Sequence, residues 1–350
     1  EKMVRLARGL HRIERDAHLG ALHRVVARRR WQDGAWLGLW FGLTALGSAY
    51  YAVIGMVALA VGCLVLVATT GRVSLGRLLW PLAVGAVVAT ALVGPVLVPY
   101  VQAQQREGFV RTMDEASRHA ATAVSFVSEP PWRPVPFAPT GRTEEDGLLP
   151  GWGALALALL SVVALSRTQR HPLLWTWAMV ALTGVVLALG PEGVRGVYAF
   201  AHRWVFGFQA VRAPARFGVL LAFGVAAAAG FAVTWWRREG PAPALRPVVL
   251  GLSAVVVIES MAWSVPYVPA PVLDTPVASW LRDVEGPGPV AFLPQPEDRA
   301  ATPLMLGTLV HGRPIVNGYS GQRPAFAGAV AGALGTFPSA DAVWTLHDLG

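Results

Sequence analysis

Residues 198–236 read YAFAHRWVFGFQAVRAPARFGVLLAFGVAAAAGFAVTWW, an aromatic and basic segment that runs directly into a long apolar stretch. From Pro214 to Trp236 almost every residue is apolar. At about 1.5 Å per residue, a helix of this length crosses a hydrocarbon core of roughly 30 Å. Pro214 suits the first helical position, because a residue there has no helical partner for its N–H. The stretch therefore predicts a membrane-spanning helix that begins at Pro214.

Basic residues gather at the start of this helix. Arg216 lies in the first turn, Arg212 just precedes it, and His202 and Arg203 are nearby. The partial positive charge of a helix N-terminus adds to theirs, so the expected guest is an anion such as a phosphate or diphosphate. The alternative is that the arginines only anchor the helix end by snorkelling to the membrane surface.

The composition predicts a polytopic membrane protein. Of the 350 residues, 54% are hydrophobic and 14% are charged, and the mean hydropathy is +0.48. A soluble globular chain carries about 25% charged residues. The net charge of +8 does not indicate nucleic-acid binding, because the basic residues are spread among short loops between apolar segments. The single cysteine, Cys63, excludes an internal disulfide.

The fold class that we expect is an α-helical polytopic membrane protein of about seven spans, followed by a partial α/β domain. The apolar run 34–70 is too long for one crossing and is interrupted at 47–51, so we predict a hairpin of two short helices. Gly38 and Gly42 form a GxxxG pattern, which predicts close helix packing. The other predicted spans are 78–98, 152–165, 173–189, 214–236 and 247–263.

The distribution of charge predicts the orientation in an inner (plasma) membrane. With the N-terminus cytoplasmic, 16 of the 29 lysines and arginines but only five of the 21 acids fall on the cytoplasmic side. This obeys the positive-inside rule and makes the C-terminal domain extracytoplasmic. Arg203, Arg212 and Arg216 then face the outer side, where topology does not require positive charge, and this favours the anion site.

Three parts follow from these assignments. Residues 1–33 predict a cytoplasmic basic amphipathic helix, with a solvated basic arm as the alternative. Residues 34–263 form the transmembrane domain, with outer loops 101–150 and 190–213. Residues 264–350 alternate short helices with apolar strand-like segments and predict the extracytoplasmic α/β domain. We expect the chain to be an internal fragment and this last domain to be truncated.

The first outer loop carries candidate catalytic residues. Residues 102–127 are expected to be helical, with Asp114 and Glu115 as carboxylates that could take the proton of an acceptor hydroxyl. Arg106 and Arg111 are neighbouring candidates for holding a phosphate. The alternative is a solvated helix whose acids and bases only pair with one another. The sequence shows no P-loop, no Cys/His cluster with metal-ligand spacing and no GxSxG motif.

Aromatic and amide side chains at the expected outer surface are candidates for contact with a sugar or acceptor, although aromatic belts and Asn-Gly turns also occur without function. These residues are Tyr50, Tyr51, Tyr100, Asn317 and Tyr319. Glu259 is the only acid inside a predicted span, and intramembrane acids are functional candidates. Its position near the outer end of the span also suits a structural role, in contact with water or an outer arginine.

Four segments carry a resemblance to a known family. GAWLGLWFGLTALGSAYYAVIGMVAL, at 34–59, resembles the paired short helices of the GT-C superfamily of polyprenyl-phosphate-sugar-dependent glycosyltransferases. The other three are similar to segments of bacterial multi-span proteins placed near that superfamily: REGFVRTMDEA, FQAVRAPARF and IVNGYSG. The resemblance implies transfer of a sugar from a polyprenyl-phosphate-linked donor to a glycan, lipid or protein acceptor, with Arg212 and Arg216 on the donor phosphate.

In such enzymes the base is an acid of the first outer loop near the N-terminus. We expect that region to precede this chain, so that Asp114 or Glu115 would be a substitute. Two alternatives stay open: a transporter or flippase of lipid-linked glycans, and a non-catalytic membrane assembly protein. The sequence commits to no cofactor, and Mg²⁺ and Mn²⁺ are the metals to test.

Overall fold

The computed structural model describes residues 18–70, 75–107, 111–130, 138–140, 145–166, 172–239, 245–261, 275–284, 286, 288–296, 298–319 and 325–349. The chain forms two compact units. The first comprises residues 1–102 and 110–266, and the second comprises 103–109 and 267–350.

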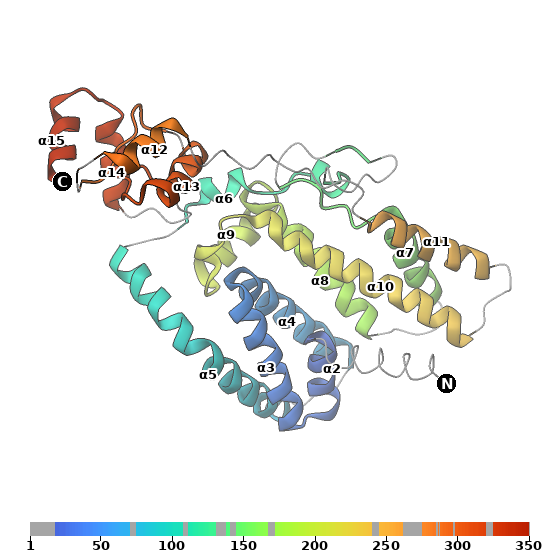
Figure 1. Cartoon of the computed structure of the whole chain (residues 1–350). Helices are drawn as coiled ribbons and strands as arrows, with labels where there is room; N and C mark the ends of the chain where they lie inside the picture. The colour runs from blue at the N-terminus through green and yellow to red at the C-terminus, as the bar shows by residue number, and fades with distance from the viewer. Residues whose placement is uncertain are drawn as a thin grey trace. The chain divides into compact units, whose positions relative to one another are not determined.

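The first unit is helical in its described part (Figure 1). Its α-helices are α2 (His18–Arg28), α3 (Trp31–Gly47), α4 (Ala49–Thr70), α5 (Leu75–Glu107, which ends in the second unit), α6 (Met113–Arg118), α7 (Trp152–Ser166), α8 (Pro172–Ala188), α9 (Arg195–Trp204), α10 (Gly218–Glu239) and α11 (Leu245–Glu259). Short 3₁₀ turns are η1 (Val124–Phe126), η2 (Gly190–Glu192), η3 (Phe208–Ala210) and η4 (Pro214–Phe217).

Three helices are long and apolar enough to cross a membrane: Ala49–Thr69, Gly76–Arg106 and Pro214–Arg237. Two shorter apolar helices cover Trp152–Val163 and Pro172–Ala188. The protein is therefore a helical membrane protein. Each of the seven apolar segments picked out in the sequence contains a helix, but the three long helices are the spans that length and composition support. The seven membrane spans that the sequence predicted are not supported by this observation.

The apolar run 34–70 breaks into two helices, as predicted. Ser48, between α3 and α4, has an extended backbone with φ −164° and ψ 128°, and its N–H still donates to the Thr44 carbonyl at 3.1 Å. The break at this polar residue places Ser48 between the end of α3 and the first turn of α4.

Glycines bring α3 into close contact with α5. A Cβ atom on Gly34 or Gly38 would overlap the carbonyl groups of Pro81 and Gly85, respectively. A Cβ on Gly85 would in turn lie 2.7 Å from the Gly34 oxygen. The role in helix packing that the GxxxG pattern predicted is therefore confirmed at Gly38, since only a residue without a side chain permits this approach.

α2 is an amphipathic helix that packs on the protein itself. Its buried residues Ala21, Leu22 and Val25 belong to the same core cluster as Leu66 of α4. Arg24 of α2 pairs with Asp33 of α3, with 3.4 Å between Arg24 Nε and Asp33 Oδ1. The predicted surface helix therefore uses its apolar face, where it is described, for internal packing. Residues 1–17 lie outside the described part.

α10 packs on both α7 and α8, and α11 packs on α7 (Figure 1). The contact between α8 and α10 is close because glycines face it from both helices. A Cβ on Gly184 would lie 2.6 Å from Leu220 Cβ, and one on Gly224 would lie 2.5 Å from Ala181 Cβ. This group of helices fixes the direction in which the start of α10 points.

The first outer loop is not the continuous helix that we predicted over 102–127. α5 ends at Glu107, α6 contains six residues, and a separate 3₁₀ turn covers Val124–Phe126. The Thr112 hydroxyl accepts from the Glu115 N–H at 3.2 Å and so caps a new helix. This local cap competes with continuation of α5 and sets the position of Glu115.

The second unit contains α12 (Pro276–Asp283), η5 (Asp298–Ala301), α13 (Thr302–His311), α14 (Ala325–Leu334) and α15 (Ala340–Asp348). The sequence predicts helices at 276–284, 301–310, 324–334 and 340–349, and the four α-helices match these ranges. It also predicts strands at 290–293 and 314–316, which do not form in the described part of this unit. These two segments meet only in an isolated parallel bridge between Val290 and Ile315, so the unit is helical where described, and the predicted α/β domain is not observed.

Candidate functional site

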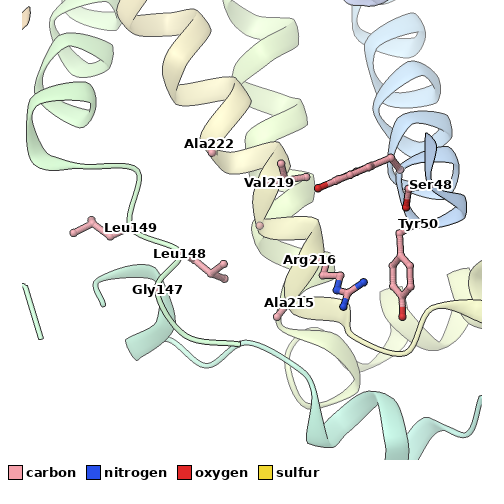
Figure 2. A pocket seen from close by; sticks show the side chains of 11 residues that line it. Ser48, Tyr50, Gly147, Leu148, Leu149, Ala215, Arg216, Val219 and Ala222 are labelled. Carbon is pink, nitrogen blue, oxygen red and sulfur yellow. The ribbon is translucent and has the colours of Figure 1, made fainter. Parts of the chain in front are cut away.

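A pocket of about 420 Å³ lies between the start of α4, the loop before α7 and the start of α10 (Figure 2). Its lining consists of Ser48, Tyr50, Tyr51, Gly147, Leu148, Leu149, Ala215, Arg216, Gly218, Val219 and Ala222. Among these described residues Arg216 is the only charged one. The pocket is thus an apolar space with one guanidinium and the hydroxyls of one serine and two tyrosines.

Arg216 lines the pocket, whereas the other three residues of η4 are buried in the protein. Pro214, Ala215 and Phe217 of η4 are buried, and the Ala215 N–H donates to the His119 carbonyl at 3.3 Å. The exposed Arg216 guanidinium stacks over the ring of Tyr50, with 4.3 Å from Cζ to the ring centroid (Figure 2). This cation–π contact orients the group. No carboxylate of the described residues pairs with Arg216.

Beside the pocket, Glu115 contacts two further arginines, Arg111 and Arg212, and these residues form a cluster with His202. Its Oε1 accepts from Arg111 Nη1 at 2.8 Å, and Arg212 Nε lies 3.3 Å from the same oxygen, as an ion pair without hydrogen-bond geometry. The side chains of Glu115, Arg111 and Arg212 are 19%, 15% and 34% exposed. The backbone N–H of Arg212 donates to Tyr50 Oη at 2.9 Å, so Tyr50 contacts both Arg212 and Arg216.

Two residues of α9 lie next to Arg111: His202 contacts it directly, and Tyr198 packs on His202. His202 Nε2 lies 3.1 Å from the Arg111 carbonyl oxygen, and its ring stacks on Tyr198 at 6.4 Å between centroids. Tyr198 is fully buried, and its hydroxyl has no hydrogen-bond partner within the described part of the chain. Burial, with a smaller effect of Tyr50, raises the pKa of Tyr198, so this hydroxyl stays neutral.

Tyr198 was not among the residues predicted from sequence. The available signal was its spacing of four from His202, which places both side chains on the same face of a short helix. The structure also shows that α9 continues to Trp204, so this spacing lies within one helix.

Four of the six residues predicted to bind phosphate come together. Arg111, His202 and Arg212 lie in the cluster with Glu115, a predicted catalytic residue, and Arg216 lines the adjoining pocket with Tyr50 and Tyr51, which were predicted to contact a sugar or acceptor. They derive from segments as far apart in sequence as α4 and α10. What joins them is the packing of α4, α8 and α10 in one unit.

Other predicted residues lie elsewhere. Arg203 is exposed, with its Cζ 5.3 Å from the Trp204 ring centroid, and is not part of the cluster. Asp114 is exposed in the first turn of α6, and Tyr100 is 64% exposed on α5. Arg106 is exposed in the last turn of α5, in the stretch that belongs to the second unit.

Asn317 and Tyr319 belong to the second unit. Asn317 is fully buried, and its amide bonds both the N–H and the carbonyl of Phe292 and donates to Gln295 Oε1 at 2.6 Å. The Tyr319 N–H points to the sulfur of Met305 at 3.2 Å. The Asn317 side chain thus holds two segments of this unit together.

Glu259 stabilises the beginning of α7. Its carboxylate is buried and accepts from the N–H groups of Trp152 and Gly153 at 3.1 and 3.0 Å. These are two of the donors that a helix start leaves without intrahelical partners. Gly151, at φ +109°, lies so close that a Cβ would be 2.7 Å from Glu259 Oε2. The partners of Glu259 are thus backbone amides rather than the arginine that we considered.

No group of three or more His, Cys, Asp or Glu residues able to hold a metal ion occurs among the residues that the structure describes. Mg²⁺ and Mn²⁺, the metals to test, thus have no such group of ligands in this part of the chain. Comparison with known proteins found no match to the chain, whether among protein-family models, curated proteins or solved structures.

Proposed function

We propose that this protein is a membrane glycosyltransferase-like protein that binds the phosphate or diphosphate of a lipid-linked sugar in the pocket at the start of α10. The resemblance to the GT-C superfamily suggests the reaction, which moves the sugar from a polyprenyl-phosphate-linked donor to a cell-envelope acceptor. The observation that carries the binding step is the Arg216 guanidinium, which is exposed at an apolar pocket and is without a carboxylate partner among the described residues.

The lining of the pocket suits an amphiphilic ligand. Leu148, Leu149, Val219 and Ala222 offer apolar surface, and Arg216 offers a charged donor at one place. Ligand pockets combine apolar walls with few polar groups in this way, and a guanidinium can bond two oxygens of one phosphate. In the proposal the lipid chain lies along α10, and the phosphate lies at Arg216.

The cluster beside the pocket is assigned a supporting role. Glu115 Oε1 is engaged by Arg111 and Arg212, so Glu115 orients these two arginines toward the phosphate side of the pocket. For the proton of the acceptor hydroxyl, Asp114 is the exposed carboxylate of the same helix, and it stays a candidate without a contact to the pocket.

The proposal includes an orientation in the inner membrane. α3, α7, α8 and α11 cross together with the three long helices, the N-terminus is cytoplasmic, and the pocket and the second unit are extracytoplasmic. The basic residues at the far ends of the helices support this arrangement through the positive-inside rule.

The test is to titrate the protein, purified in detergent, with polyprenyl phosphate and polyprenyl-phosphate sugar. Arg216→Ala is expected to weaken binding by about 2 kcal/mol, roughly 30-fold, because a charge-assisted contact is lost. Arg203→Ala removes an exposed arginine outside the pocket and is expected to bind normally.

Equal binding by Arg216→Ala and the parent protein would overturn the phosphate site and favour the non-catalytic assembly protein. Donor binding without sugar transfer to any acceptor, in the presence of Mg²⁺ or Mn²⁺, would retain the site and favour a transporter or flippase instead of the transferase.

A further inference from the structure

We propose that α9 is an interfacial helix, which inserts an exposed aromatic face into the boundary between the lipid headgroups and acyl chains. α9 contains ten residues, about 15 Å of helix, and is too short to span a bilayer. Its apolar exposure therefore differs from that of the long helices, whose exposed apolar side chains face the hydrocarbon core. The inference does not depend on the proposed ligand of the pocket.

The helix is divided into faces. Tyr198 and Ala201 are buried against the rest of the first unit. Val197, Phe200 and Trp204 follow one another at helical spacing on another face and are 43%, 65% and 67% exposed. A soluble helix places polar residues on such a face. Here it carries two large aromatic rings, and Phe206, just beyond the helix, is 73% exposed.

The position of α9 in the chain indicates what covers this face. α8 ends at Ala188, and the candidate span of α10 begins at Pro214, so α9 lies in the connection between two helices that pack together. α9 itself packs against η2, η3 and the adjoining α8. Its exposed rings are therefore held near the end of a membrane-spanning helix, at the level where headgroups begin.

The charge on α9 fits the same partner. Arg203 is exposed, and its guanidinium lies 5.3 Å from the centroid of the Trp204 ring. Tryptophan is enriched at the membrane interface, and arginine there keeps its stem in apolar surroundings while its head reaches the lipid phosphates. Arg203 thus faces a bilayer phosphate rather than the ligand of the pocket.

The insertion has a consequence for the cluster. His202 of α9 contacts the Arg111 carbonyl, and Tyr198 of α9 packs on Phe208 at 5.6 Å between centroids. These contacts connect the lipid-facing helix to Arg111. α9 therefore fixes the depth at which Arg111 and Glu115 lie relative to the headgroups.

The experiment measures the depth of α9 in the full chain, reconstituted in nanodiscs of phosphatidylcholine and phosphatidylglycerol. Spin labels are attached to single cysteines at Val197 and Phe200 in a Cys63→Ala background, and Ala199, which is exposed on another face, serves as the matched control. Collision rates with oxygen, which concentrates in the acyl region, are compared with those of a water-soluble nickel complex.

The labels at 197 and 200 are expected to collide preferentially with oxygen and to lie about 5–10 Å below the phosphates. The label at 199 is expected to collide preferentially with nickel. Equal nickel access at all three positions would overturn the proposal, because α9 would then be in water. Protection of 197 and 200 from both reagents would also overturn it, because a protein partner or second copy would then cover the face.

Discussion

Glu115 determines which arginines of the site pair with a carboxylate and which does not. It engages Arg111 at 2.8 Å and Arg212 at 3.3 Å, whereas Arg216 contacts the face of the Tyr50 ring. Two guanidiniums thus share one carboxylate, whereas the Arg216 guanidinium has no hydrogen-bond partner among the described residues and keeps its donors for a ligand. The contact with Tyr50 restricts Arg216 without using those donors, since the ring acts through its π face.

Glu115→Gln is expected to increase the affinity of the pocket for a lipid phosphate at low salt. The glutamine oxygen still accepts from Arg111, so the geometry is kept while one negative charge near the ligand is removed. Isothermal titration at two ionic strengths measures the effect, and salt is expected to reduce the gain. Asp114→Asn removes an exposed carboxylate from the same helix as the control. A loss of affinity in Glu115→Gln alone would contradict this view.

Glu259→Ala is expected to destabilise the protein by about 1–2 kcal/mol, because the N–H groups of Trp152 and Gly153 lose their acceptor at the start of α7. Thermal unfolding in detergent measures this loss. Ser260→Ala, next in the chain and exposed, removes only a bond to the Val256 carbonyl and serves as the control. Unchanged stability in Glu259→Ala would show that water replaces the carboxylate.

At the scale of elements, small residues decide which helices approach one another. Gly34 and Gly38 of α3 face Pro81 and Gly85 of α5, and Gly184 of α8 faces α10. In a membrane the lipid chains are as apolar as the side chains, so close backbone packing replaces the hydrophobic effect as the force between helices. The glycines are therefore structural determinants of the first unit, although most other residues of these helices are apolar.

Gly38→Ala is expected to destabilise the packing of α3 on α5, although alanine favours a helix by about 1 kcal/mol over glycine. The new methyl group would overlap the backbone of Gly85, and such overpacking typically costs about 1–3 kcal/mol. Gly47→Ala provides the matched control on the same helix, because no atom lies within 4 Å of its added Cβ. Thermal unfolding of both variants separates steric effects from helix propensity, and equal unfolding temperatures would refute the close contact.

At the scale of the whole molecule, the two ends of α4 provide the test of orientation. Its candidate span covers Ala49–Thr69. If α4 crosses the membrane as proposed, the pocket at its start and the basic residues that follow Thr69 in the sequence lie on opposite sides. In the proposed orientation the pocket is extracytoplasmic, where a lipid-linked donor would reach it.

Single cysteines at Tyr51 and Thr69, both exposed, measure this orientation in a Cys63→Ala background. A membrane-impermeant maleimide is expected to label Tyr51→Cys from the outside of intact cells, and Thr69→Cys only in inverted vesicles. The expectation follows from the basic residues beyond Thr69, which the positive-inside rule assigns to the cytoplasm. The reverse pattern would place the pocket in the cytoplasm and contradict the proposed donor side.

The sequence alone was sufficient to locate the apolar helices and the separation of α3 from α4, but it missed α9 and the break between α5 and α6. Apolar length, Pro214 at a helix start and the polar interruption at Ser48 are local signals, and local hydrogen bonding and helix geometry act on them directly. The same local signals also marked Arg212 and Arg216 as a basic cluster. They could not give the number of crossings, because α3, α7, α8 and α11 have 15–17 residues, a length near the limit for a span.

Only the tertiary structure decided which charges meet. Glu115 pairs with Arg212 across 97 positions, and Glu259 caps a helix 107 positions earlier in the chain. The same packing placed Arg203 on an exposed face and Tyr198 on the buried face of one short helix. Such contacts depend on how helices pack rather than on local periodicity. The sequence therefore determined the apolar helices and the charges near their ends, whereas packing determined which charges pair with one another and left the Arg216 guanidinium facing an apolar pocket.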